Sequence, residues 1–169
     1  MESVAEYTAR IKAHVEGKDP IAVQRESYEV IASLVEGLSR EAVDRPWAPG
    51  KWSTREILAH LADVEVANAW RYRQILQRSG VVLTPFDQDE WAKLGDYSKS
   101  DAKESLELFR MLRKNNLALF ARLGEEEWQR FGMHTERGKL TLKELVTQMA
   151  GHDLNHIAQL REAAAKAGC

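Results

Sequence analysis

The amino-acid sequence predicts an all-α protein, a four-helix bundle with one long crossover connection and no β-sheet. Apolar residues recur at helical spacing through four long segments. Only 4 prolines interrupt the 169 residues, and no segment shows the sustained alternation of apolar and polar residues that marks a half-buried strand. Residues that commonly cap helices stand before several of the segments. A single domain over residues 1–169 is expected, because this length suffices for one hydrophobic core.

The first helical segments are bounded by residues that start and stop helices. A short leading helix is expected at about 4–15, because Gly17 and Pro20 follow it. The first core helix is expected at about 20–38, with Asp19 as its cap and Pro20 in its first turn. The second core helix is expected to begin at Ser53, whose spacing to Glu56 is that of a capping box, and to run to Gly80.

A connection of about 20 residues then separates the second core helix from the third, which is too long for a simple hairpin between neighbours. Within it, residues 85–97 are expected to be a loop with one helical turn near 87–94. The third core helix is expected at about 101–124, ending at a glycine. The fourth begins with a second capping box, Thr141 to Glu144, and is expected to run almost to the C-terminus. These helices would be about 28–39 Å long, similar enough to pack side by side.

Composition and charge exclude several classes of function. A chain that is 44% hydrophobic and 30% charged is typical of a globular protein. A net charge of −2 without a basic stretch gives no reason to expect a nucleic-acid partner. We expect no membrane partner either, because no apolar run is long enough to span one and the N-terminal residues do not resemble a signal peptide. The only cysteine, Cys169, cannot form an internal disulfide. A cytoplasmic location is therefore expected.

Three histidines are the most informative residues. His152 and His156 lie four residues apart on the apolar face of the fourth core helix, and His60 lies on the apolar face of the second. A buried imidazole needs partners for its ring nitrogens, and one shared divalent metal would satisfy three imidazoles at once. Neutral imidazole is the form that binds, so metal affinity is expected to fall below about pH 6. The alternative is that each is a core histidine bonded to a carbonyl or hydroxyl group.

The spacing of His152 and His156 also resembles the H-E-x-x-H motif of zinc proteases, but we reject that interpretation. Asp153 is shorter than the glutamate that this motif requires. The chain also has no histidine or glutamate at a suitable spacing after His156. A third ligand must therefore come from upstream in the sequence.

Three sequence stretches carry a family resemblance. Residues 50–53 (GKWS), 56–61 (EILAHL) and 150–156 (AGHDLNH) are similar, in this order, to motifs of the DinB/YfiT-like family of bacterial metal-binding bundles. The resemblance covers about residues 21–161. It implies a four-helix bundle in which His60, His152 and His156 hold a divalent metal, often nickel or zinc. Characterised relatives include transferases and isomerases that use low-molecular-weight thiols, whereas most members have no assigned reaction. The resemblance also suggests a homodimer.

Further polar residues near the predicted metal site are candidates for supporting roles. Asp63 is one turn from His60 and could orient it, although a solvated helix-surface aspartate is the simpler interpretation. Gln159 is close to His156 on the same helix and could hydrogen-bond a water at the site. Arg71 continues the His60 face and could hold a substrate carboxylate, or it could simply pair with an acidic neighbour. His134 could line the mouth of a pocket, or it could simply be an exposed loop residue. Trp91 could line a pocket, or it could belong to a lid that packs on the bundle.

These observations leave three hypotheses for function. The first is a metal-dependent enzyme on a small-molecule substrate, either a thiol-dependent S-transferase or a hydrolase. Three protein ligands leave open positions on an ion, which is typical of catalytic sites. The second is a non-catalytic metal-binding stress-response protein. The third is an interaction module whose histidines are core polar groups. The inward-facing histidines favour the first two, but the sequence shows no obvious general base.

Overall fold

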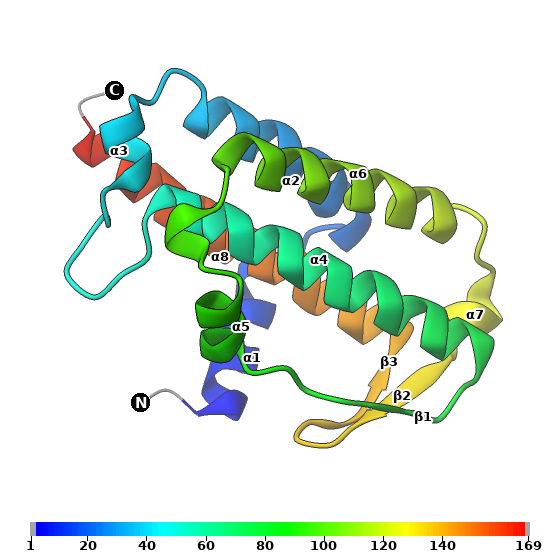
Figure 1. The fold of residues 1–169 in the computed structure, drawn as a ribbon. Coiled ribbons are helices and arrows are strands. Elements are labelled where there is room, and N and C mark those ends of the chain that lie inside the picture. The colour runs from blue at the N-terminus through cyan, green and yellow to red at the C-terminus, as the bar shows by residue number, and fades with distance from the viewer. Residues whose placement is uncertain (1–2, 168–169) are drawn as a thin grey trace.

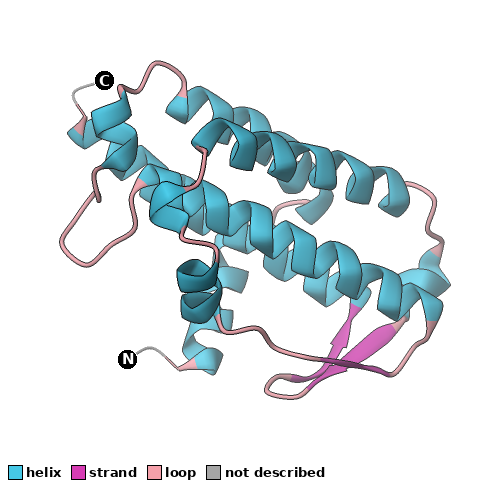
Figure 2. Cartoon of the chain, in the orientation of Figure 1, coloured by secondary structure: helices cyan, strands magenta, loops and turns pink. Residues whose placement is uncertain are grey.

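The computed structural model describes residues 3–167 and confirms the predicted four-helix bundle with a long crossover (Figures 1 and 2). Four long helices form the bundle. In cross-section α4 packs against α6 and α8, and α2 packs against the same two helices; α1 lies against α8. The helices are α1 (Val4–Val15), α2 (Pro20–Val35), α3 (Arg40–Asp44), α4 (Thr54–Gln77), α5 (Gln88–Leu94), the 3-10 helix η1 (Tyr97–Lys99), α6 (Ala102–Phe120), α7 (Glu125–Gln129) and α8 (Leu142–Lys166).

Local sequence signals set the starts of the bundle helices as expected. The Ser53 hydroxyl accepts a hydrogen bond from the Glu56 backbone N–H at 3.3 Å, and the Glu56 carboxylate accepts one from the Ser53 N–H at 2.7 Å. Thr141 and Glu144 form the same box at the start of α8. The Asp19 carboxylate accepts from the N–H of residue 21 at 2.9 Å. These bonds satisfy backbone donors that the first helical turn leaves without partners.

The expectation of no sheet is wrong. The strands β1 (Val81–Leu83), β2 (Phe131–His134) and β3 (Gly138–Thr141) form a small sheet in that order, with β1 parallel to β2 and β2 antiparallel to β3. Strands of 3 and 4 residues are too short to show a pattern of alternation, which is why the sequence did not reveal them. The sheet lies at one end of α4 and α8 (Figure 2).

Several boundaries also differ from expectation. Helix α2 ends at Val35 rather than Leu38, and α4 ends at Gln77, before Gly80. The third core helix, α6, ends at Phe120, and the short helix α7 follows Gly124. The short helix α3 was not predicted, whereas α5 occupies the turn expected within the crossover. The residue Cys169 lies outside the described residues. Within residues 3–167 no helix is both long and apolar enough to cross a membrane.

The bundle has two apolar layers with a polar layer between them. One layer, around Ile57 and Leu160, lies toward the start of α4, and the other, around Tyr72 and Leu145, lies toward the sheet. Between them, α4, α6 and α8 each carry buried polar side chains. His60 and His156 lie where this polar layer meets the first apolar layer, next to Leu61 and Ile157, and His152 lies next to Asp153.

An ion-pair network that the sequence analysis missed occupies the polar layer. Arg113 on α6 donates to Glu65 on α4, and to both carboxylate oxygens of Asp153 on α8 at 2.6 and 3.1 Å. Ser27 on α2 also donates to Asp153, at 2.8 Å. All three charged residues are at most 3% exposed. Burial alone would lower the pKa of Arg113, but Asp153 and Glu65 together raise it, so the guanidinium stays charged. One side chain thus connects the two histidine-bearing helices.

Gly151, next to His152, allows α1 to approach α8 closely. A Cβ atom at this position would lie 2.0 Å from the backbone oxygen of Ile11. We therefore expect Gly151→Ala to displace α1 and destabilise the protein by at least about 2 kcal/mol, because backbone atoms cannot move aside as a side chain can. Urea denaturation measures this loss. Gly50→Ala, where a Cβ meets no atom within 4 Å but φ is +71°, gives the cost of backbone strain alone. Equal losses in the two variants would contradict the close-packing argument.

Candidate metal centre

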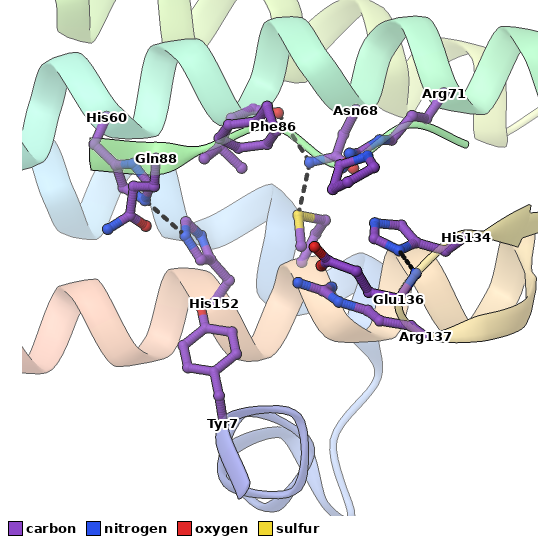
Figure 3. Close-up of a pocket in the computed structure, with 13 residues that line it drawn as sticks. Tyr7, His60, Asn68, Arg71, Phe86, Gln88, His134, Glu136, Arg137 and His152 are labelled. Carbon is purple, nitrogen blue, oxygen red and sulfur yellow. Dashed lines mark hydrogen bonds between the residues drawn. The ribbon is translucent and has the colours of Figure 1, made fainter. Parts of the chain in front are cut away.

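The structure brings His60, His152 and His156 together. The Nε2 atom of His152 lies 3.0 Å from that of His60 and 3.2 Å from that of His156. One ring nitrogen from each histidine lies within 4.8 Å of the others. Figure 3 shows His60 on α4 facing His152 on α8. The helical spacing of His152 and His156 places both on one face of α8, and packing of α4 on α8 supplies the third imidazole.

Burial keeps the three imidazoles neutral. His60, His152 and His156 are 1%, 5% and 6% exposed. Burial lowers the pKa of His60 and His152 well below the ordinary histidine value, with smaller contributions from the neighbouring imidazoles. Burial also lowers the pKa of His156, to about 4, although Gln159 and Asp153 oppose the shift. Neutral imidazole has the free lone pair that metal binding requires. We therefore expect metal binding to persist below pH 6. The pH at which binding is lost should be lower than the ordinary pKa of histidine indicates.

Gln159 fixes the orientation of one imidazole. Its Oε1 atom accepts a hydrogen bond from Nδ1 of His156 at 2.8 Å. With its proton on Nδ1, His156 presents the lone pair of Nε2 to the centre of the cluster. Asp63 does not play this part for His60. Its carboxylate instead accepts from the hydroxyl of Tyr97 at 2.6 Å, and Nδ1 of His60 is buried without a hydrogen-bond partner.

The donor set fits a divalent cation. Two nitrogens bound to one ion at about 2.0–2.1 Å lie about 2.8–3.4 Å apart at common bond angles. The separations of His152 from His60 and from His156 fall in this range. The full set of three nitrogens spans up to 4.8 Å, so His60 and His156 would draw closer together on binding one ion. Hydrogen bonds cannot satisfy the cluster instead, since each Nε2 offers either one proton or one lone pair and His152 faces two neighbours. Asp153 points away to Arg113 and Ser27, in agreement with our rejection of the zinc-protease interpretation.

A pocket opens beside the cluster. It has a volume of about 140 Å³, which is enough for a small molecule. His60 and His152 line one end, and Arg71 and His134 line the other (Figure 3). His156 is not part of the lining. The other lining residues are Tyr7, Val64, Asn68, Pro85, Phe86, Gln88, Glu136, Arg137 and Met149.

The structure places two of the weaker sequence candidates in this pocket and excludes a third. Arg71 and His134 line it, whereas Trp91 packs its ring against Phe86 at 4.5 Å and lines a neighbouring hollow on the outer side of α4. Asn68 was missed, although its helical spacing from His60 and Val64 was a usable signal. Gln88, Glu136 and Arg137 were also missed, because only the crossover and the hairpin bring them to the pocket.

The buried imidazoles predict a pH-dependent stability of the metal-free protein. Their folded pKa values lie below the unfolded value of about 6.5, so the unfolded chain binds more protons as the pH falls below 6.5. The free energy of unfolding is thus expected to fall as the pH drops from 6.5 to 4. His156 alone should account for about 2–3 kcal/mol of this loss. Urea denaturation in chelator at several pH values measures this. A His156→Gln variant should show a shallower dependence, and identical profiles would contradict the prediction.

Comparison with known proteins agrees with the fold. A family model described as the DinB superfamily matches residues 25–160. A Bacillus subtilis protein named "Putative metal-dependent hydrolase YfiT" is 27% identical over 167 residues, which cover 98% of this chain and 94% of YfiT. A relative from Oceanobacillus iheyensis, also named a "Putative metal-dependent hydrolase", is 28% identical over 131 residues, which cover 78% of this chain and 76% of that protein.

The solved structure of YfiT matches with a TM-score of 0.82 at 26% identity, covering 88% of this chain and 86% of YfiT. Its description is a probable metal-dependent hydrolase with an unusual four-helix bundle topology. The segment that the family model matches contains α4, α6 and most of α8, and so includes all three histidines. The chain belongs to the DinB superfamily.

Proposed function

We propose that this protein is a metal-dependent hydrolase of a small molecule, with one divalent ion, nickel or zinc, held by His60, His152 and His156. The observation that carries the proposal is the convergence of three buried Nε2 atoms beside a pocket. The names of the relatives, which describe metal-dependent hydrolases, support it. When bound, a divalent ion would supply a positive charge that polarises a carbonyl group and acidifies a water molecule or thiol.

The chain's own residues prepare the site for this chemistry. The neutral imidazoles add no charge, so the positive charge of an ion would remain undiminished. Their burial excludes bulk water from one side, while His60 and His152 face the pocket from which a substrate would approach. Glu136 is the one carboxylate among the described residues that line the pocket, and it is exposed.

Activity measurements on metal-exchanged protein test the proposal. Protein purified without an affinity-tag nickel column is stripped with chelator, reloaded with Zn²⁺ or Ni²⁺, and offered a panel of esters, amides and lactones. We expect hydrolysis that requires the metal and disappears in His60→Ala. A His14→Ala variant, which alters a half-buried histidine on α1 outside the cluster, is the control. Activity that survives both chelation and His60→Ala would contradict a metal-dependent mechanism.

The same panel separates hydrolysis from the alternatives. Turnover that appears only when a low-molecular-weight thiol and an electrophile are added would identify a thiol-dependent S-transferase. Tight metal binding without turnover of any compound would favour a non-catalytic metal-binding protein. Absence of metal binding would leave an interaction module whose histidines are core polar groups.

We also propose that the protein forms a homodimer. Three large, exposed apolar side chains line one surface hollow: Trp70 on α4, Val82 on β1 and Leu94 on α5, which are 64%, 61% and 83% exposed. Exposed apolar patches of this kind are typical of interfaces. Light scattering is expected to give twice the chain mass of 19.2 kDa. Trp70→Glu should shift the particle to the monomer mass, and a monomeric wild type at micromolar concentration would contradict the proposal.

A further inference from the structure

The end of the pocket opposite the histidines is cationic. Arg71 from α4, His134 from β2 and Arg137 from the turn between β2 and β3 face one another there, as Figure 3 shows. Arg71 is 9% exposed, His134 is 4% exposed and Arg137 is half-buried. Three separate elements therefore bring two guanidinium groups and an imidazole to one place.

Neither arginine has an anionic partner among the described residues. Arg71 donates to the backbone oxygen of Thr84 at 2.7 Å, and Arg137 donates to the side-chain oxygen of Gln148 at 3.3 Å. The Nε atom of Arg137 is buried without any partner, as is the side-chain nitrogen of Gln148. Burial and the positive charge of Arg137 both lower the pKa of Arg71. Arg71 also lies over the ring of Phe86. Guanidinium charges that are at least half-buried and have only neutral partners are costly, so this arrangement favours an anion that comes from outside the chain.

His134 adds a hydrogen-bond donor to the same group. Its Nδ1 atom accepts from the backbone N–H of Glu136 at 3.3 Å, which leaves the ring proton of the neutral form on Nε2. Burial lowers the pKa of His134, and the charges of Arg137 and Arg71 lower it further, so the imidazole is neutral at pH 7. A neutral imidazole and two guanidinium groups can all donate to the oxygens of one anion.

The nearby carboxylate does not neutralise this end of the pocket. Glu136 is exposed, and its negative charge opposes the lowering of the His134 pKa, but among the described residues its carboxylate forms no ion pair with Arg71 or Arg137. The hydrogen bond from Arg71 to Thr84 holds the crossover segment against α4, and this is a structural role for Arg71. It does not account for the Nε atom of Arg137, which has no partner. The lining therefore carries two guanidinium charges against one carboxylate.

We propose that Arg71, His134 and Arg137 bind an anionic oxygen group of the substrate, a carboxylate or a phosphate. Anion binding is argued from these residues alone. The further statement that the reacting bond of the same molecule lies at the histidine end rests on the proposed function. His60 and Arg71 are 11 residues apart on α4, so their Cα atoms lie about 16 Å apart along the helix axis. The substrate class is thus an elongated small molecule with its anionic group at one end and its hydrolysable bond toward the other.

Anion binding can be tested on the metal-free protein, so the result does not depend on the metal site. We would titrate ¹⁵N-labelled protein with hexanoate, inorganic phosphate and the neutral analogue hexanamide, and follow the Nε–H signals of Arg71 and Arg137. We expect at least one anion to shift both signals and hexanamide to shift neither. Tighter binding of hexanoate identifies a carboxylate site, and tighter binding of phosphate identifies a phosphate site.

Variants assign the binding to these side chains. Arg137→Gln should weaken the anion about tenfold or more, because it removes charged hydrogen bonds, whereas Arg71→Lys keeps the charge and should weaken it less. Arg78→Gln removes the same charge at the exposed end of α4 and should have no effect. If neither anion shifts the two signals in the wild-type protein, the inference is wrong. This test uses the wild type only, so it still decides the matter if Arg137→Gln fails to fold. Equal weakening by Arg78→Gln would also overturn it.

The outcomes separate this inference from the proposed function. Anion binding by a protein that binds no Zn²⁺ would support the anion site and contradict the metal-dependent hydrolase. Zn²⁺ binding without anion binding would leave the hydrolase proposal standing and overturn the anion site.

Discussion

Alanine in place of His60, His152 or His156 is expected to weaken the binding of Zn²⁺ about 100-fold or more. Loss of a residue that only orients a ligand costs roughly 10–100-fold, so loss of the ligand itself should cost at least the upper figure. Competition with a chromophoric chelator measures the affinity. His14→Ala, on α1, should leave it unchanged, and His134→Ala, at the other end of the pocket, should change it little.

Thermal denaturation gives an independent measure of the same site. A bound ion stabilises only the folded chain, by about 2.7 kcal/mol when free metal is about 100 times Kd. Chelation should then lower the Tm of wild type by about 5–10 °C and leave the Tm of His60→Ala unchanged. Equal effects of chelator on both proteins would mean that the ion binds elsewhere.

Removal of the buried guanidinium is expected to have the largest effect on stability. Arg113→Met should destabilise the protein by about 3–5 kcal/mol, because Glu65 and Asp153 would remain buried without a cation. Urea denaturation measures the loss. Metal affinity should also fall, since Arg113 joins α4 to α8 and so holds His60 against His152.

A matched variant distinguishes charge pairing from packing in this network. Burial raises the pKa of Glu65, although Arg113 opposes the shift, so its carboxylate is already the more easily protonated partner. Glu65→Gln should therefore cost much less than Arg113→Met. A loss as large as that of Arg113→Met would contradict our account of an electrostatic network with one cation between two carboxylates.

The sequence was sufficient for the features that depend on local spacing. The boxes at Ser53 and Thr141 predicted the starts of α4 and α8, because a capping box involves residues three positions apart. The pairing of His152 with His156 follows from one turn of helix. The placement of His60 opposite them required the packing of α4 on α8, which the family resemblance supplied.

Features that depend on tertiary contacts were not predicted. Strands β1 and β2 pair although they are far apart in the sequence, and each is too short to show periodicity. Arg137 and Glu136 looked like ordinary turn residues, and only the position of the hairpin brings them to the pocket. Arg113 lies between Phe109 and Phe120 on the inner face of α6, which was a signal of a buried charge, but its partners depend on the register of three helices.

Anomalous diffraction from crystals of zinc-loaded protein, collected at the zinc absorption edge, tests the central claim most directly. Our account predicts one strong peak per chain, within about 2.0–2.1 Å of Nε2 of His60, His152 and His156, and in contact with the pocket. A zinc-loaded crystal with no peak among these three imidazoles, or with its peak at other residues, would contradict it.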